Sequence, residues 1–266
     1  MNMIGVFDSG IGGLALLSHI RAQLPDTPIL YLADQAYAPY GDLTHDRVVE
    51  RSRVISQWLQ AQGCTLVVVA CNTATALAIE ALRTFCAIPI VGVEPGIKPA
   101  ALQSLSQRIG ILATENTVAS TRYLLLLERF LPDVEILSQG CAGLADAIEQ
   151  QSEDLDQRLL RYCQPLIDWG VDQIVLGCTH YPLVKERIAL LVGPQVTIVD
   201  TSGAIALEVK RRYPQLLTGP HGDTSIALYT TGSAVRFDSS VRAYPRLAWL
   251  QDLASTELTL PALAKL

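Results

Sequence analysis

The sequence predicts an α/β fold made of two similar doubly wound domains with mainly parallel sheets. Short apolar runs rich in β-branched residues alternate with helical patterns along the chain. Two of these runs end at a cysteine, Cys71 or Cys178, that is followed by polar residues and a helical segment. Because ligands bind at the carboxyl ends of strands in open α/β sheets, each domain is expected to present one thiol there.

Length and composition narrow the class of protein. The chain has 266 residues, of which 50% are apolar and 17% charged, enough for one large or two small domains. A net charge of −6 argues against a nucleic-acid partner, which usually requires a basic patch. There is no apolar run of about 18 residues and no leader with a basic start, so we expect no membrane span, no signal peptide and a cytoplasmic location.

The first domain is expected over residues 1–94 together with 208–266. Thr44 can cap its second helix, and Gly63 ends that helix. A late strand at 226–230 is expected to return to this domain. Beyond Pro245 the pattern is weak. The other strands are predicted at 4–7, 29–33, 67–70 and 89–93, and the helices at 14–24, 44–63, 74–82 and after Gly232-Ser233.

The second domain is expected over residues 95–207. The same alternation of strands and helices continues through it, which predicts parallel pairing with right-handed crossovers. Its strands are predicted at 109–113, 134–137, 173–177 and 196–199, and its helices at 123–130, up to Glu149, at 152–169, from Leu183 and after Asp200-Thr201-Ser202-Gly203.

The two strand-end cysteines are the candidate reactive groups. Helix N-termini and free backbone N–H groups favour thiolate over thiol at such cysteines. His180, two residues after Cys178, can carry a proton near neutral pH. Two opposed thiols suit the inversion of a carbon centre, because one face loses a proton while the other gains one. The remaining cysteines are interpreted as structural, namely Cys64, Cys86, Cys141 and Cys163.

A nucleotide-dependent oxidoreductase is the main rival. The segment from Gly10 to Ala15 fits the dinucleotide pattern G-x-G-x-x-A, and Asp34 lies near the position of a ribose-binding acid. Against this interpretation, Asp8 would place a negative charge beside a pyrophosphate, and the two cysteines would have no role.

Three further classes of site are open. A zinc site from Cys71, Cys178 and His180 lacks the usual short ligand spacing. A Cys-His-Asn hydrolase would use one thiol and leave the other idle. A non-catalytic protein that binds an anion or an amino acid could use the same scaffold. None of the four lysines is obviously placed for a pyridoxal phosphate Schiff base (Lys98, Lys185, Lys210 and Lys265).

Five motifs in order resemble the bacterial glutamate racemases of the aspartate/glutamate racemase family. The resemblance as a whole extends from residue 4 to about residue 232, and the first two motifs favour glutamate over aspartate. The motifs are Val6-Phe7-Asp8-Ser9-Gly10-Ile11-Gly12-Gly13-Leu14, Pro39-Tyr40-Gly41, Ala70-Cys71-Asn72-Thr73-Ala74, Gly92-Val93-Glu94-Pro95 and Gly177-Cys178-Thr179-His180-Tyr181-Pro182.

The resemblance implies cofactor-independent interconversion of L- and D-glutamate, with D-glutamate supplied to peptidoglycan. An enzyme of this kind has its active site between two α/β domains, holds no metal and is usually a homodimer. Another acidic amino acid such as aspartate is the alternative substrate.

The resemblance also assigns residues. Cys71 and Cys178 would be the catalytic acid/base pair, with Asp8 assisting on the Cys71 side and His180 on the Cys178 side. Glu149 would be a third auxiliary acid, placed by counting from Cys141, although Ala142 stands where the family often has proline. The residues expected to bind substrate are Asp8, Ser9, Pro39, Tyr40, Gly41, Cys71, Asn72, Thr73, Thr117, Cys178, Thr179 and His180.

Overall fold

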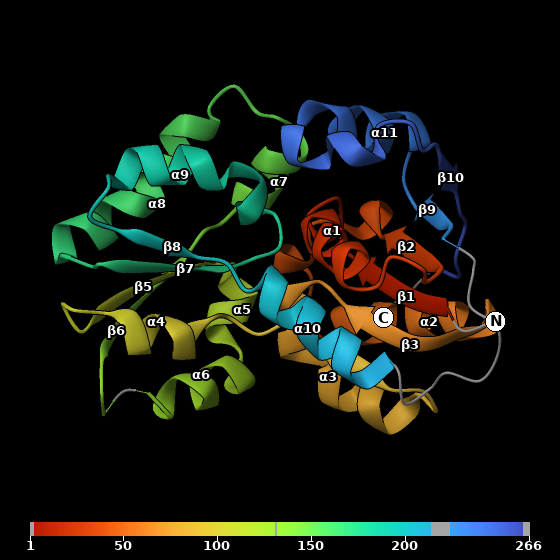
Figure 1. The fold of residues 1–266 in the computed structure, drawn as a ribbon, viewed down its shortest axis with the longest axis horizontal. Coiled ribbons are helices and arrows are strands. Elements are labelled where there is room, and N and C mark those ends of the chain that lie inside the picture. The colour runs from red at the N-terminus through yellow and green to blue at the C-terminus, as the bar shows by residue number, and fades with distance from the viewer. Residues whose placement is uncertain (1–2, 131, 214–223, 263–266) are drawn as a thin grey trace.

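The computed structural model describes residues 3–130, 132–213 and 224–262, and it contains two parallel β-sheets (Figure 1). The first sheet has the strand order β10-β9-β2-β1-β3-β4, and the second has the order β6-β5-β7-β8. The predicted α/β class is therefore confirmed. The strands of the first sheet are β1 (Met3–Asp8), β2 (Ile29–Ala33), β3 (Cys64–Val69), β4 (Ile90–Gly92), β9 (Ile226–Thr230) and β10 (Ser255–Glu257).

Helices cover both faces of the first sheet. Alternate residues of β1 point to opposite faces, so that Val6 packs toward one helical layer and Phe7 toward the other. The layer on the Val6 side contains α1 (Gly13–Gln23), α10 (Ser202–Arg212) and α11 (Ala234–Ala243), and the layer on the Phe7 side contains α2 (His45–Ala61) and α3 (Asn72–Phe85).

The second sheet is covered in the same way. Figure 1 shows α8 and α9 on one face and α4 and α6 on the other. The strands are β5 (Arg108–Ala113), β6 (Glu135–Gly140), β7 (Gln173–Gly177) and β8 (Thr197–Val199). The helices are α4 (Ile97–Gln103), α5 (Glu115–Ala119), α6 (Thr121–Glu128), α7 (Leu144–Glu149), α8 (Leu155–Trp169) and α9 (Lys185–Val192).

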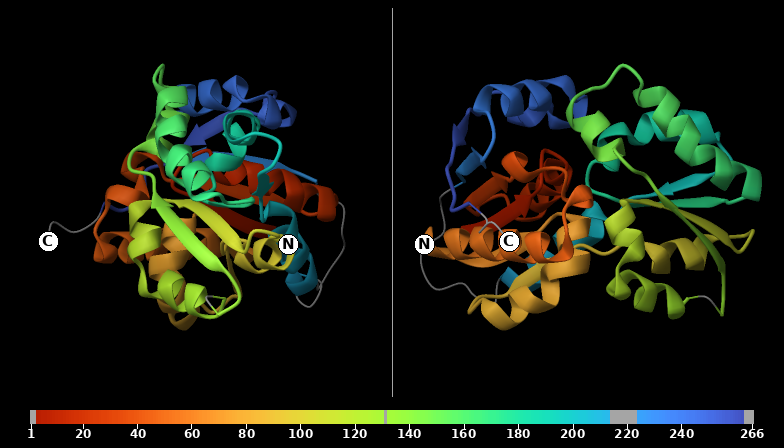
Figure 2. Two further views of the ribbon diagram at one scale, coloured as in Figure 1. Left: turned by 90° about the vertical axis from the view of Figure 1, so that its left-hand side faces the viewer. Right: turned by 180° about the vertical axis from the view of Figure 1, so that it is seen from behind.

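Both sheets reverse their strand order at one point, and the two points face each other. In the first sheet the reversal lies between β1 and β3, and in the second between β5 and β7. Crevices at such switch points are the usual ligand sites of doubly wound sheets. The two halves lie side by side, as the view from behind in Figure 2 shows, so the segments that follow these four strands meet between them.

Several local expectations can be compared with the structure. The late strand does return to the first sheet, where β9 pairs in parallel with β2. Gly63, just beyond α2, has a φ of +89°, which suits the end of a helix. The segment from Leu183 begins instead as the 3₁₀ turn Tyr181–Val184 before α9. The elements α4, α5 and β10 were not predicted, because each is short and has little periodicity.

The predicted domain boundary at residues 207/208 falls inside α10, a continuous helix that packs against α1. The division into 1–94 with 208–266 and 95–207 therefore stays a proposal. No helix within the described ranges is both long enough and apolar enough to cross a membrane.

Candidate active site

Cys71 lies at the N-terminus of α3, directly beyond β3. Its Sγ accepts a hydrogen bond from the Ala74 N–H at 3.4 Å and lies 3.9 Å from Ser9 Oγ. The residue is 4% exposed. The sulfur is therefore fixed at the carboxyl ends of the central strands β1 and β3 of the first sheet.

Cys178 occupies the corresponding place after β7 in the second sheet. Its Sγ lies 4.0 Å from His180 Nδ1. Cys71 and Cys178 line one cavity of about 20 Å³, space for about one water molecule. An amino acid can therefore enter only when the surrounding residues move apart. The cavity is lined by Ser9, Pro39, Tyr40, Gly41, Cys71, Asn72, Thr73, Thr114, Ala145, Cys178, Thr179 and His180.

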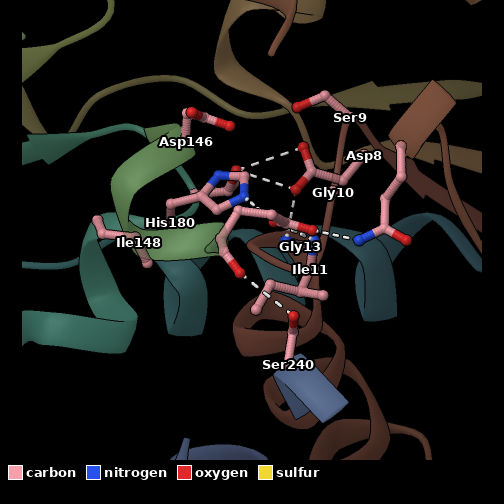
Figure 3. Close-up of polar contacts among 12 residues, drawn as sticks. Asp8, Ser9, Gly10, Ile11, Gly13, Asp146, Ile148, His180 and Ser240 are labelled. Atoms are coloured by element: carbon pink, nitrogen blue, oxygen red, sulfur yellow. Dashed lines mark hydrogen bonds and ion pairs between the residues drawn. The ribbon is translucent and has the colours of Figure 1, made fainter. Parts of the chain in front are cut away.

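Asp8 closes the end of β1 beside this cavity. Its Oδ2 accepts a hydrogen bond from the Gly13 N–H at 2.7 Å, and Thr179 Oγ1 donates to both of its carboxylate oxygens at 3.2 and 3.3 Å (Figure 3). Burial raises the pKa of Asp8, and the positive charge of His180 offsets this only partly. Asp8 thus connects the first strand of one half with the residue after Cys178 in the other.

His180 and Glu149 form a buried pair behind Cys178. His180 Nε2 donates to Glu149 Oε2 at 2.7 Å, and the Ile11 N–H donates to the same oxygen at 3.0 Å. Burial alone would lower the pKa of His180, but hydrogen bonds to Cys178 and Glu149 raise it well above its usual value. Burial opposes ionisation of Glu149, but its bond to His180 leaves the pKa of Glu149 lowered. His180 therefore holds a proton more readily than an ordinary histidine.

The glycine-rich turn after β1 is filled by residues of the second half. A Cβ on Gly12 would lie 2.6 Å from His180 Nδ1, and a Cβ on Gly10 would collide with the Glu149 carboxylate. The turn thus binds a carboxylate with the N–H of Ile11 at the place where a dinucleotide fold would bind a pyrophosphate. This geometry argues against the oxidoreductase interpretation.

Asp34 also has a structural partner. Its carboxylate forms a bidentate ion pair with Arg51 at 2.7 Å, and both side chains are at most 1% exposed. It also accepts a hydrogen bond from Tyr40 OH at 2.6 Å, which holds the Pro39–Gly41 loop over the cavity. A carboxylate engaged in this way is not available to a ribose.

Hydroxyl and amide groups connect the two halves around the cavity. Thr73 Oγ1 lies 2.9 Å from Thr114 Oγ1, which in turn lies 2.8 Å from Thr117 Oγ1. Asn116 Nδ2 donates to the carbonyl groups of Tyr40 and Leu43 at 3.1 and 2.9 Å. Every predicted substrate-binding residue except Asp8 and Thr117 lines the cavity. Asp8 contacts the lining through Thr179, and Thr117 contacts it through Thr114.

Sequence reasoning missed three polar residues at this site. Thr114 directly follows β5 at the switch point, so the rule that identified Cys71 could also have identified it. Asn116 and Gln35 act through contacts between the two halves, for which the sequence carries no signal. Gln35 Nε2 donates to Glu149 Oε1.

The thiolate form, which a helix start is expected to favour, is disfavoured at Cys71. Burial is the largest effect, and together with the negative charge of Asp8 it raises the pKa of this thiol despite its hydrogen bonds with Ala74 and Ser9. Burial alone raises the pKa of Cys64 to about 12 and that of Cys163 to about 11, in keeping with structural roles. Within the described ranges, no group of three or more histidine, cysteine and acidic side chains could hold a metal ion.

Comparisons with known proteins agree with this geometry. Residues 13–209 match the family model described as Asp/Glu/Hydantoin racemase. A glutamate racemase of Cupriavidus pinatubonensis is 47% identical over 212 residues, which is 79% of this chain and 78% of the relative. One of Herpetosiphon aurantiacus is 43% identical over 239 residues, covering 88% of this chain and 94% of the relative.

Solved structures give the same result. A glutamate racemase isoform from Bacillus anthracis superposes with a TM-score of 0.83 at 31% identity, covering 98% of both chains. The Escherichia coli glutamate racemase, solved with L-glutamate and an activator, has the same TM-score and identity and covers 91% of this chain and 95% of that chain.

Proposed function

The chain belongs to the Asp/Glu/hydantoin racemase family, and from this premise we propose that it racemises glutamate without a cofactor, by acid/base chemistry at Cys71 and Cys178. The observation that carries the proposal is that both thiols, one from each half, line a single cavity. The relatives named glutamate racemase support glutamate as the substrate.

The chemistry needs one base and one acid on opposite sides of Cα. In one direction a thiolate removes the Cα proton, so that a C–H bond breaks and an S–H bond forms. The thiol on the other side then gives its proton to the same carbon from the opposite face. Reversing the two roles converts the other enantiomer, which is why the two groups are of the same type.

The raised pKa of Cys71 fits this role. A thiolate that is poorly solvated is a stronger base, and the Cα–H of an amino acid is a weak acid, so the two are better matched than with an ordinary thiolate. On the Cys178 side, the imidazolium of His180 can donate its Nδ1 proton toward the sulfur. We propose Asp8 and His180 as the auxiliary groups of the two sides and Glu149 as the partner of His180.

Substrate binding is assigned to uncharged donors around the cavity. The hydroxyl groups of Ser9, Thr73 and Thr179 and the amide of Asn72 can hold carboxylates, and they can stabilise the charge that develops when Cα loses its proton. The Asp8 carboxylate is placed to attract the substrate ammonium. Two solved relatives were crystallised with L-glutamate and with D-glutamate, so a fold of this kind accommodates both enantiomers.

The wider role follows from the family resemblance. We propose that the D-glutamate made in the cytoplasm supplies peptidoglycan synthesis, and that the protein is a homodimer without a nucleic-acid or membrane partner. Size-exclusion chromatography with light scattering tests the dimer.

The activity itself is tested with purified protein and L-glutamate in the absence of pyridoxal phosphate. Chiral chromatography should show a racemic mixture at the end of the reaction. Aspartate run in parallel distinguishes the alternative substrate. Saturable binding of glutamate without conversion would instead indicate a non-catalytic binding protein and end the proposal.

A further inference from the structure

Gln35, in the loop after β2, connects the first sheet to the His180–Glu149 pair. Its Nε2 donates to Glu149 Oε1, and its Oε1 accepts a hydrogen bond from Thr230 Oγ1 at 2.7 Å. Thr230 is fully buried at the end of β9, and its Oγ1 also accepts the Gly232 N–H at 3.0 Å. The side chain of Gln35 therefore has a fixed partner at each end.

The neighbours determine the orientation of the Gln35 amide. If the amide were turned over, its oxygen would face Oε1 of Glu149, and two acceptors would meet. In the observed orientation an N–H faces the carboxylate, and the hydroxyl of Thr230 faces the amide oxygen. A Cβ on Gly232 would lie 2.9 Å from Gln35 Cβ, so the side chain is also confined from the other side.

The two oxygens of Glu149 have different partners. Oε2 accepts from His180 and Ile11, whereas Gln35 is the donor to Oε1 among the described residues. The backbone beneath is held separately, because Ser240 Oγ donates to the Glu149 carbonyl at 3.2 Å (Figure 3). What Gln35 controls is therefore the rotation of the carboxylate and not the position of α7.

We propose that Gln35 is a positioning residue of the active site, which holds the Glu149 carboxylate against His180 and thereby keeps His180 directed at Cys178. The contacts form a continuous path, from Gln35 through Glu149 and His180 to the sulfur, and this path crosses from the first half to the second. The role rests on the proposed racemisation, because it acts on one of the two thiols of that reaction.

The charges around the pair explain why a neutral donor stands at position 35. Two carboxylates, Asp8 and Glu149, already face one imidazolium, so a third negative charge would oppose the ionisation of Glu149. Gln35 and Glu149 also line a second pocket beside the active-site cavity, and Asp146, Gln150 and Arg236 lie on its wall. The titratable and charged groups near the pair are Asp8 on β1, Tyr31 on β2, Cys178 after β7, Tyr244 after α11, and Asp146 and Arg236 of this second pocket.

Two substitutions separate positioning from folding. Gln35→Met keeps the length of the side chain and removes the donor, and kcat is expected to fall about tenfold with KM little changed, as when one hydrogen bond to a charged group is lost. Gln35→Glu can donate to Glu149 only while the new carboxyl is protonated. Its kcat should approach the wild-type value at acid pH and fall as pH rises, and the same sample at acid pH serves as its own folding control.

Gln150 offers the matched control. It lines the same pocket as Gln35, is exposed, and donates to Asp146 Oδ1 at 2.9 Å rather than to Glu149. Gln150→Met and Gln150→Glu should leave kcat and its pH profile as in the wild type. If Gln35→Glu and Gln150→Glu lost kcat equally as pH rises, the loss would come from the added negative charge in the pocket, and the assignment of Gln35 would be overturned.

A readout without substrate distinguishes this proposal from the racemase proposal. The His180 ring can be followed by NMR of histidine-labelled protein, since the chain has 4 histidines. In Gln35→Met, His180 should lose its proton at a lower pH than in the wild type. In Gln150→Met, His180 should lose its proton at the same pH as in the wild type. If the wild-type protein is inactive and the His180 titration still differs between the wild type and Gln35→Met, the racemisation proposal is contradicted but the role of Gln35 is not. Wild-type kinetics together with an unchanged His180 titration in Gln35→Met would overturn the role of Gln35.

Discussion

Nε2 of His180 lies 2.7 Å from Oε2 of Glu149, and this contact shifts the pKa of both side chains. Together with the hydrogen bond to Cys178 it raises the pKa of His180, and it lowers that of Glu149, in both cases against the effect of burial. The pair stands directly behind Cys178 and rests on the glycine turn of the opposite half. The same pair of side chains therefore carries the charge beside Cys178 and forms part of the contact between the two halves.

Glu149→Gln should destabilise the protein by about 3 kcal/mol, since it leaves a buried imidazolium without its partner. Glu149 has a lowered pKa in the folded state, so its contribution is present above about pH 4.5 and is lost as pH falls through the folded value. His180 has a raised pKa, so its contribution is full below about pH 6.5 and is lost as pH rises through the folded value. Urea unfolding should therefore show the largest difference from wild type between these limits, and a difference independent of pH would contradict the ion pair.

Cys71→Ala and Cys178→Ala should each reduce racemisation by a factor of about 10³ or more, because general acid/base groups contribute about 10²–10⁴-fold each. Both variants should keep the circular dichroism spectrum of the wild type, because a small side chain is removed at the edge of a cavity. A variant with full activity would remove that cysteine from the mechanism. Cys163→Ala, on the buried face of α8, is the control that should keep activity.

Alkylation should report the buried state of Cys71. Because burial raises its pKa, little thiolate is present at neutral pH, and iodoacetamide should modify Cys71 slowly until the solution is strongly alkaline. Glutamate should slow the reaction further by occupying the cavity. Peptide mapping by mass spectrometry measures the rate, and rapid modification near pH 7 would show that the thiol is more ionised than the structure indicates.

Gly12→Ala should reduce activity on the order of 100-fold, because the new Cβ would lie 2.7 Å from the His180 backbone nitrogen and displace the imidazole. The control is Gly63→Ala, which has no atom within 4 Å of its Cβ but has a φ of +89°. That substitution should cost about 1 kcal/mol of stability without loss of activity. Equal activity of the two variants would contradict close packing between the turn and His180.

Glutamate and NAD should affect thermal stability differently. At a concentration of about 100 Kd, glutamate should stabilise the folded protein by about 2.7 kcal/mol. NAD should have no effect, because the glycine turn is occupied by Glu149 and His180, and Asp34 is bound to Arg51. Differential scanning fluorimetry with both compounds checks this. A saturable rise in melting temperature with NAD would revive the dinucleotide interpretation.

The positions of the two thiols could be predicted because the rule behind them is local. A β-branched run fixes a buried parallel strand, and its carboxyl end must lie at the ligand edge of the sheet. The positions of Cys71 and Cys178 could therefore be predicted without knowing how the two halves contact each other. The strand β10 was missed because it is a three-residue edge strand beyond Pro245.

The protonation of the site could not be predicted in the same way. The N–H donor to Cys71 can be inferred from the helix start, but the depth of its burial and the nearby Asp8 charge depend on how the chain folds. The contact between Gln35 and Glu149 joins residues 114 positions apart, and no periodicity encodes it. Glu149 was placed by resemblance alone, and its bond to His180 became visible only in three dimensions.

The source of the proton at Cα tests the central claim most directly. L-glutamate carrying protium at Cα is converted in deuterated water, and the first fraction of product and the remaining substrate are analysed by mass spectrometry. Two thiols on opposite faces predict that the D-glutamate carries deuterium while the remaining L-glutamate still carries protium. D-glutamate that retains the original protium would mean that a single base returns the same proton, and it would contradict a site built from Cys71 and Cys178.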